Sequence, residues 1–167
     1  TYEEENSMLQ FYRDGRKLAA IPENGYFDKV FSADGKYAAL KAREIISVWD
    51  TVSGERLLTI NRDPHTIAFS QDGSHIATAD YNYKFLNSYG IIEIWDIKEK
   101  RMIKSIKMKH SLPLSLSFSP DAKSLAFYTL GKTDEFYTSL YDVTNGELMY
   151  TVDYGSEVYP PVFSPDG

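Results

Sequence analysis

A short motif, Phe-Ser followed by an Asp turn, occurs four times in this 167-residue chain and constrains its fold more than any other feature. The four phenylalanines are separated by 38, 49 and 45 residues. Self-similarity at such a spacing predicts a repeat architecture. The copies are Phe31-Ser32-Ala33-Asp34-Gly35, Phe69-Ser70-Gln71-Asp72-Gly73, Phe118-Ser119-Pro120-Asp121-Ala122 and Phe163-Ser164-Pro165-Asp166-Gly167.

A second motif follows each of the first three copies and ends in an aromatic residue and an aspartate. Its aromatic position advances by 46 residues and then by 46 again. Two independent motifs therefore repeat at similar spacings, and the second repeats at a constant 46 residues. The copies are Val48-Trp49-Asp50, Ile94-Trp95-Asp96 and Leu140-Tyr141-Asp142.

Between the two motifs, short β-prone runs alternate with turn residues, and no helical periodicity of useful length appears. The 13 Tyr, 9 Phe and 2 Trp also favour strands. We therefore expect an all-β chain of four-stranded antiparallel modules that stack on their neighbours. The sequence predicts 15 strands in one domain at residues 1–167: half a module at 8–21, complete modules at 26–60, 65–107 and 113–152, and the start of another at 161–167.

Composition excludes several classes of function. The net charge of −6 disfavours nucleic-acid binding, and the absence of Cys excludes disulfides, thiolate metal sites and cysteine nucleophiles. No apolar run approaches the roughly 18 to 20 residues of a membrane-spanning helix. We expect neither a nucleic-acid nor a membrane partner.

Four-stranded units of about 40 to 46 residues with these two motifs resemble the WD-repeat β-propeller family, from Met8 to Gly167. The resemblance implies a partial β-propeller with about three complete blades and partial blades at both ends. It also implies that the innermost strand a of each blade lines a channel and that strand d forms the rim. The a–b and c–d turns would then share one face, and the b–c loops would project from the other, the top face.

The sequence departs from the family's hydrogen-bonded network of a Gly-His pair, a Ser or Thr in strand b, a turn Asp and the Trp. His65 and His110 lie near the family position but lack the preceding Gly, and Tyr141 replaces the third Trp. Asp80 fits the turn Asp of the second unit, whereas the first unit has Ala42-Arg43-Glu44 there. The resemblance is therefore to a divergent member.

Most chemistry-bearing residues have a structural interpretation. An Asp before Gly shapes a tight turn, so we expect Asp34, Asp72, Asp121 and Asp166 to act locally, with Ala122 implying a different turn type. We expect Trp49, Trp95 and Tyr141 to pack between blades. The scattered His65, His75 and His110 support no metal site, and we predict no catalytic residue and no cofactor.

Six cations lie between residues 98 and 109, which suits an acidic or phosphate partner as well as the protection of an outer edge strand. We favour edge protection at this point. The cations are Lys98, Lys100, Arg101, Lys104, Lys107 and Lys109.

The units differ in the distance from the Phe of strand a to the aromatic residue of strand c, which is 18, 26 and 23 residues. The extra length falls in the b–c loops, at residues 80–89 and 131–136. Aromatic residues suit recognition because they supply contact area at low entropic cost, although they also suit internal packing. The candidate partner-binding residues are Tyr81, Tyr83, Phe85, Tyr89 and Phe136.

We therefore predict a non-enzymatic scaffold that binds a protein or peptide partner through its top-face loops. One alternative is a propeller hydrolase or lyase that uses Asp80, Asp134 and Glu135, although nothing in the sequence pairs these acids with a base. Another is a purely structural segment of a larger protein. In each case we expect the remainder of a propeller, or a second copy, to cover the open blade edges.

Overall fold

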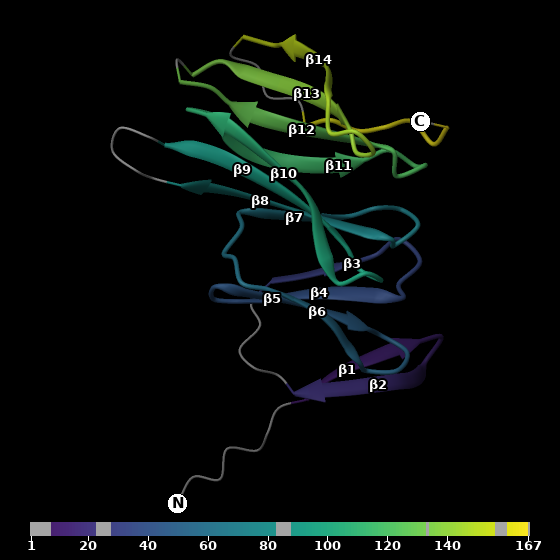
Figure 1. Ribbon diagram of the computed structural model, residues 1–167. Coiled ribbons are helices and arrows are strands. Elements are labelled where there is room, and N and C mark those ends of the chain that lie inside the picture. Colours follow the sequence, from purple (N-terminus) through teal and green to yellow (C-terminus); the bar gives the residue numbers. More distant parts are fainter. Residues whose placement is uncertain (1–7, 23–27, 83–87, 133, 156–159, 167) are drawn as a thin grey trace, which may run out of the picture. The chain divides into compact units, whose positions relative to one another are not determined.

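The computed structural model describes residues 8–22, 28–82, 88–132, 134–155 and 160–166, and within these ranges it contains fourteen β-strands and no helix (Figure 1). The prediction of an all-β chain built from four-stranded antiparallel blades is confirmed. The chain divides into two compact units, Thr1–Asp63 and Pro64–Gly167. That residues 1–167 form one domain stays a prediction.

The first unit contains a hairpin, β1–β2, and one blade in the strand order β3-β4-β5-β6. The hairpin packs on the blade through a core of Phe11, Ile21, Ala38, Leu40 and Trp49. Burial of each large apolar side chain contributes roughly 1.5–3 kcal/mol. The strands are β1 (Met8–Arg13), β2 (Arg16–Pro22), β3 (Asp28–Phe31), β4 (Tyr37–Ala42), β5 (Ile45–Asp50) and β6 (Arg56–Ile60).

The second unit contains two complete blades, with strand orders β7-β8-β9-β10 and β11-β12-β13-β14. Its core includes Ile92 and Ile94 of one blade and Leu125 and Phe127 of the other. The strands are β7 (Thr66–Phe69), β8 (His75–Asn82), β9 (Tyr89–Asp96), β10 (Arg101–Lys109), β11 (Leu112–Phe118), β12 (Ser124–Leu130), β13 (Phe136–Asp142) and β14 (Leu148–Asp153).

The three blades share one strand register. Trp49, Trp95 and Tyr141 are each the second-last residue of strand c, and they pair with Ala38, Ile76 and Leu125 of strand b. A register shift lies at or next to the aromatic residue in the pairing of strands c and d in each blade. The 46-residue period is therefore a structural period.

Two predicted boundaries differ from the structure. The sequence predicts the start of a further module at residues 161–167, but residues 160–166 form no strand and no described strand pairs with them. The sequence predicts a loop at residues 80–89, yet the β8–β9 ladder continues to the pair Asn82↔Tyr89.

Candidate functional site

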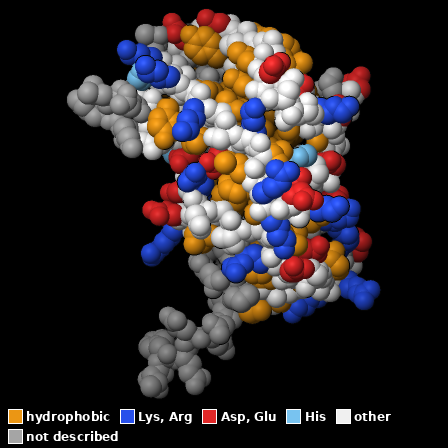
Figure 2. Space-filling model, viewed as in Figure 1, with side chains coloured by type: hydrophobic (Ala, Val, Ile, Leu, Met, Phe, Trp, Pro, Cys, Tyr) orange, Lys and Arg blue, Asp and Glu red, His pale blue; other side chains and the backbone are white. Residues whose placement is uncertain are grey.

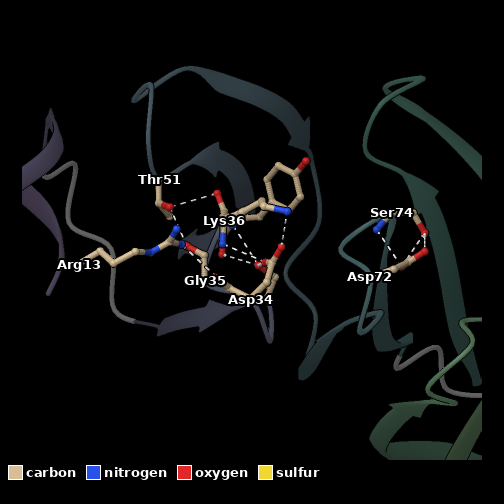
Figure 3. A network of polar contacts seen from close by, with 9 residues as sticks. Arg13, Asp34, Gly35, Lys36, Thr51, Asp72 and Ser74 are labelled. Carbon is tan, nitrogen blue, oxygen red and sulfur yellow. Dashed lines mark hydrogen bonds and ion pairs between the residues drawn. The ribbon is translucent and has the colours of Figure 1, made fainter.

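The first three Phe-Ser-x-Asp copies form the same hydrogen-bonded turn between strands a and b. In the second blade the Ser70 hydroxyl donates to Asp72 Oδ1 (2.7 Å) and accepts the backbone N–H of His75 (2.9 Å). Asp72 Oδ1 also accepts the backbone N–H of Ser74 at 3.0 Å (Figure 3). These contacts confirm the local role predicted for the turn acids. The same three contacts recur at 2.7–3.1 Å in the first blade, through Ser32, Asp34, Lys36 and Tyr37, and in the third, through Ser119, Asp121, Lys123 and Ser124.

The expectation of a different turn type at Ala122 is wrong. Ala122 has a φ of +59°, close to the +67° of Gly35 and the +70° of Gly73. Its N–H donates to the Ser119 carbonyl at 2.9 Å, as the N–H of each glycine does to the equivalent serine. The serine and aspartate contacts hold the backbone in the left-handed region even where the residue has a Cβ.

The turn hydrogen bonds lower the pKa values of the acids. Burial alone would raise the pKa of Asp34 and is the largest single influence. Hydrogen bonds from Lys36 and Ser32, with the charge of Lys36 2.9 Å away, outweigh burial and lower this pKa to about 2. Burial is again outweighed at Asp72, chiefly by the Ser70 hydroxyl, so its pKa is lowered too. Hydrogen bonds from Ser119 and Ser164, respectively, are the main causes of the lowered pKa values of Asp121 and Asp166.

The aspartate of the second motif has a role that the sequence analysis did not assign. Asp50 Oδ1 accepts the backbone N–H groups of Val52 (2.8 Å) and Ser53 (2.9 Å), which fixes the turn between strands c and d. Asp96 and Asp142 accept backbone N–H groups of their own c–d turns in the same way. The recurrence of Asp after each aromatic residue was the available signal.

The family's hydrogen-bonded network is only partly present, as the sequence indicated. His65 Nδ1 lies 3.6 Å from Asp80 Oδ1, so the second blade retains the pair of histidine and turn acid. The indole N–H groups of Trp49 and Trp95 are buried, and no described residue accepts a hydrogen bond from them. Their cross-strand neighbours, Ala38 and Ile76, have no side-chain oxygen to accept them.

The packing predicted for the aromatic residues of strand c is seen for two of them. Trp49 is 9% exposed in the core of the first unit, and Tyr141 packs against the core of the second unit beside Phe127. Burial raises the pKa of Tyr141. Trp95 is half-buried.

The candidate residues Tyr81 and Tyr89 lie at the end of the β8–β9 hairpin that is opposite the Ser-x-Asp turn. Tyr81 pairs with Gly90, and Tyr89 pairs with Asn82. Because successive residues of a strand point to opposite faces, the two tyrosines lie on opposite faces of the hairpin. Both are half-buried, and the Lys107 ammonium lies 5.5 Å from the Tyr89 ring centroid.

Of the other three candidates, the structure describes only Phe136. Tyr83 and Phe85 lie outside the described residues. Phe136, at the start of β13, stacks on the buried Tyr128 with ring centroids 5.2 Å apart, a contact that belongs to internal packing. Among the described candidates, Tyr81 and Tyr89 therefore share one hairpin end, and Phe136 does not belong to it.

The structure also describes the three acids of the alternative enzymatic interpretation, Asp80, Asp134 and Glu135. Asp80 contacts His65, so the expectation that no base pairs with these acids is wrong for Asp80. Glu135 accepts a hydrogen bond from the Tyr137 hydroxyl at 2.8 Å, which contributes to a raised pKa for Tyr137. Asp134 is an exposed turn residue with a φ of +60°.

Two clefts lie beside Ser-x-Asp turns in the described part of the chain, one in the first unit and one in the second. In the first, a cleft of 360 Å³ is lined by Phe11, Tyr12 and Phe31, and an Arg13 guanidinium N–H at its side donates to the Asp34 carbonyl at 3.0 Å (Figure 3). In the second, a cleft of 440 Å³ is lined by side chains of both signs of charge, Asp72, Asp121, Lys104 and Lys123. Neither cleft contains any of the predicted partner-binding residues.

Among the described residues, no three His, Cys, Asp or Glu side chains are grouped so as to hold a metal ion. The same part of the chain has no helix of the length and apolar character needed to cross a membrane.

Comparisons with known proteins agree with the fold described above. No family model matches the chain. The chain is 24% identical over 168 residues to the WD repeat-containing protein SL1-17 of Schistosoma mansoni, a match that covers 97% of this chain and 50% of that protein. A solved structure described as the crystal structure of the eukaryotic initiation factor superposes with a TM-score of 0.61 at 18% identity, over 77% of this chain and 32% of the other.

This chain spans about half the length of that relative and about a third of that solved structure. WD-repeat proteins serve in general as scaffolds for protein partners and are generally not enzymes. The two repeated motifs, the four-stranded blades and these similarities together support the resemblance of this chain to WD-repeat β-propellers.

Proposed function

We propose that the chain is part of a non-enzymatic scaffold that binds a protein or peptide partner at the end of the β8–β9 hairpin. The observation that carries the proposal is the length of this hairpin. Its strands have 8 residues each, against 6 each for β4 and β5 of the first blade. The extension carries Tyr81 and Tyr89, residues of the type that dominates binding energy at protein interfaces.

Because Tyr81 and Tyr89 lie on opposite faces of the hairpin, a partner that uses both must enclose its end. Tyr83 and Phe85 lie between them in sequence and stay proposed partner-binding residues. Phe136 is the weakest member, since its ring already stacks on Tyr128. The remainder of a propeller, or a second copy, stays the proposed cover for the open blade edges.

The test begins with peptides selected against the wild-type chain from a displayed library, and it then compares their affinities for two double variants. Tyr81→Ala/Tyr89→Ala should weaken binding at least tenfold. The control Tyr12→Ala/Tyr150→Ala removes two tyrosines that are 60% and 58% exposed elsewhere, and it should leave binding unchanged. Equal affinity for wild type and for the hairpin variant, at matched urea midpoints, would reject the proposed surface.

A further inference from the structure

Strand β10 is the outermost strand of the second blade and, with 9 residues, the longest strand in the described part of the chain. It pairs with β9 on one side only. None of the described strands pairs with its other edge, whose backbone N–H and C=O groups are able to pair with an added strand.

This edge is basic within an acidic chain. Residues 98–109 contain six cations and one acid, Glu99, whereas the whole chain has a net charge of −6. Figure 2 shows Lys and Arg side chains intermixed with acids and hydrophobic groups over the visible face. Four of the six cations lie on β10 itself, namely Arg101, Lys104, Lys107 and Lys109.

The other outer strands show that edge protection alone does not account for these cations. Strand β6 carries one cation, Arg56, and β14 carries none. Yet every residue of β14 is exposed, with Leu148, Met149 and Tyr150 each more than half exposed. A general need for lysines at blade edges would apply to β14 first.

The register places the cations where an added strand would meet them. Lys107 and Lys109 pair with Ile91 and Tyr89 and lie two residues apart, on one face, while Lys104 lies on the other face. Lys107 and Lys109 are exposed. In the part of the chain that the structure describes, no carboxylate forms an ion pair with Lys107 or Lys109, whereas the Lys104 ammonium donates to the Asn145 carbonyl at 3.0 Å.

We propose that the free edge of β10 binds an extended acidic segment of a partner protein as an added β-strand. Backbone hydrogen bonds would supply the pairing. Asp or Glu at alternate positions of the segment would face Lys107 and Lys109, because directly opposed side chains of neighbouring strands lie about 5 Å apart. The site goes beyond the proposed hairpin surface because it uses Lys107, Lys109 and the β10 backbone, and it borders that surface where the Lys107 ammonium lies 5.5 Å from the Tyr89 ring centroid.

The experiment uses the full chain and a blocked synthetic peptide of alternating glutamate and valine, titrated by fluorescence anisotropy. A second peptide with one central N-methylated valine keeps the charges but loses a backbone donor. The variant K107E/K109E reverses the charge of the edge and keeps it charged, so that its protection against self-pairing is retained. The control K17E/K29E makes the same change in net charge at two exposed lysines of the first unit.

We expect binding to weaken at least tenfold on N-methylation and at least tenfold in K107E/K109E, but not in K17E/K29E. A lysine-valine peptide should in turn prefer K107E/K109E over wild type. The Tyr81→Ala variant should bind the acidic peptide normally, which separates this site from the hairpin surface. The proposal is overturned if wild type does not bind the acidic peptide, if N-methylation has no effect, or if both charge variants lose binding equally.

Discussion

The buried serine of each Ser-x-Asp turn is expected to be a principal stabilising group of its blade, and Ser70 is the sharpest case. Its side chain is fully buried, and its hydroxyl accepts the His75 N–H at 2.9 Å while it donates to Asp72 at 2.7 Å. In Ser70→Ala the His75 N–H loses its acceptor, which costs about 1–3 kcal/mol for a buried donor. The Asp72 carboxylate is exposed and finds water instead. We therefore expect a loss of about 2 kcal/mol, or roughly 30-fold in the unfolding equilibrium.

Ser74→Ala is the matched control. The Ser74 hydroxyl contacts both oxygens of the same Asp72 at 2.8 Å, but it accepts no backbone N–H in this turn. Its removal should cost about 0.5–1 kcal/mol, as for an ordinary hydrogen bond. Urea unfolding followed by Trp fluorescence gives the free energies, and hydrogen exchange at the His75 amide reports the local opening. If Ser70→Ala costs no more than Ser74→Ala, or if the His75 amide exchanges at the wild-type rate, the reasoning is wrong.

Two further predictions concern pH and packing. The free energy of unfolding should fall as pH drops from about 4 to about 2. Folding lowers the pKa values of four turn acids, that of Asp34 to about 2, so the unfolded chain binds protons more readily than the folded chain in this range. The acids are Asp34, Asp72, Asp121 and Asp142. Urea midpoints measured at pH 7, 4, 3 and 2 check this, and a flat profile would contradict it. Gly90→Ala should destabilise the second unit by about 1–3 kcal/mol, since the new Cβ would collide with the Ser111 carbonyl oxygen and lie 2.7 Å from Pro113 Cδ. Thermal unfolding of the variant measures the loss, and an unchanged midpoint would contradict the close approach of β9 to residues 111–113.

The spacing of the two motifs predicted the blades because the residues of each motif form the hydrogen bonds of a turn. Ser70 and Asp72 close the a–b turn, and Asp96 fixes the c–d turn, so the residues that recur are those whose hydrogen bonds are local. Such contacts are visible in sequence because their partners lie within a few residues. The strand order and the repeated aromatic register followed from them.

The hairpin candidates were harder to predict because strand pairing depends on partners that the local pattern does not name. The sequence pattern predicts loop positions for Tyr81 and Tyr89. The ladder between β8 and β9 extends to both residues, so they lie on opposite faces of the hairpin. The prediction of a different turn type at Ala122 was wrong for a related reason. The contacts of Ser119 and Asp121 hold its backbone in the left-handed region, against the preference of a residue with a Cβ.

The equivalence of the blades is tested most directly by cross-strand nuclear Overhauser effects between backbone protons of strands b and c. The account predicts contacts for the pairs Ala38 with Trp49, Ile76 with Trp95 and Leu125 with Tyr141, all in the same register. Contacts displaced by one residue in any blade, or absent from one of the three, would contradict the claim that a single 46-residue structural unit repeats along this chain.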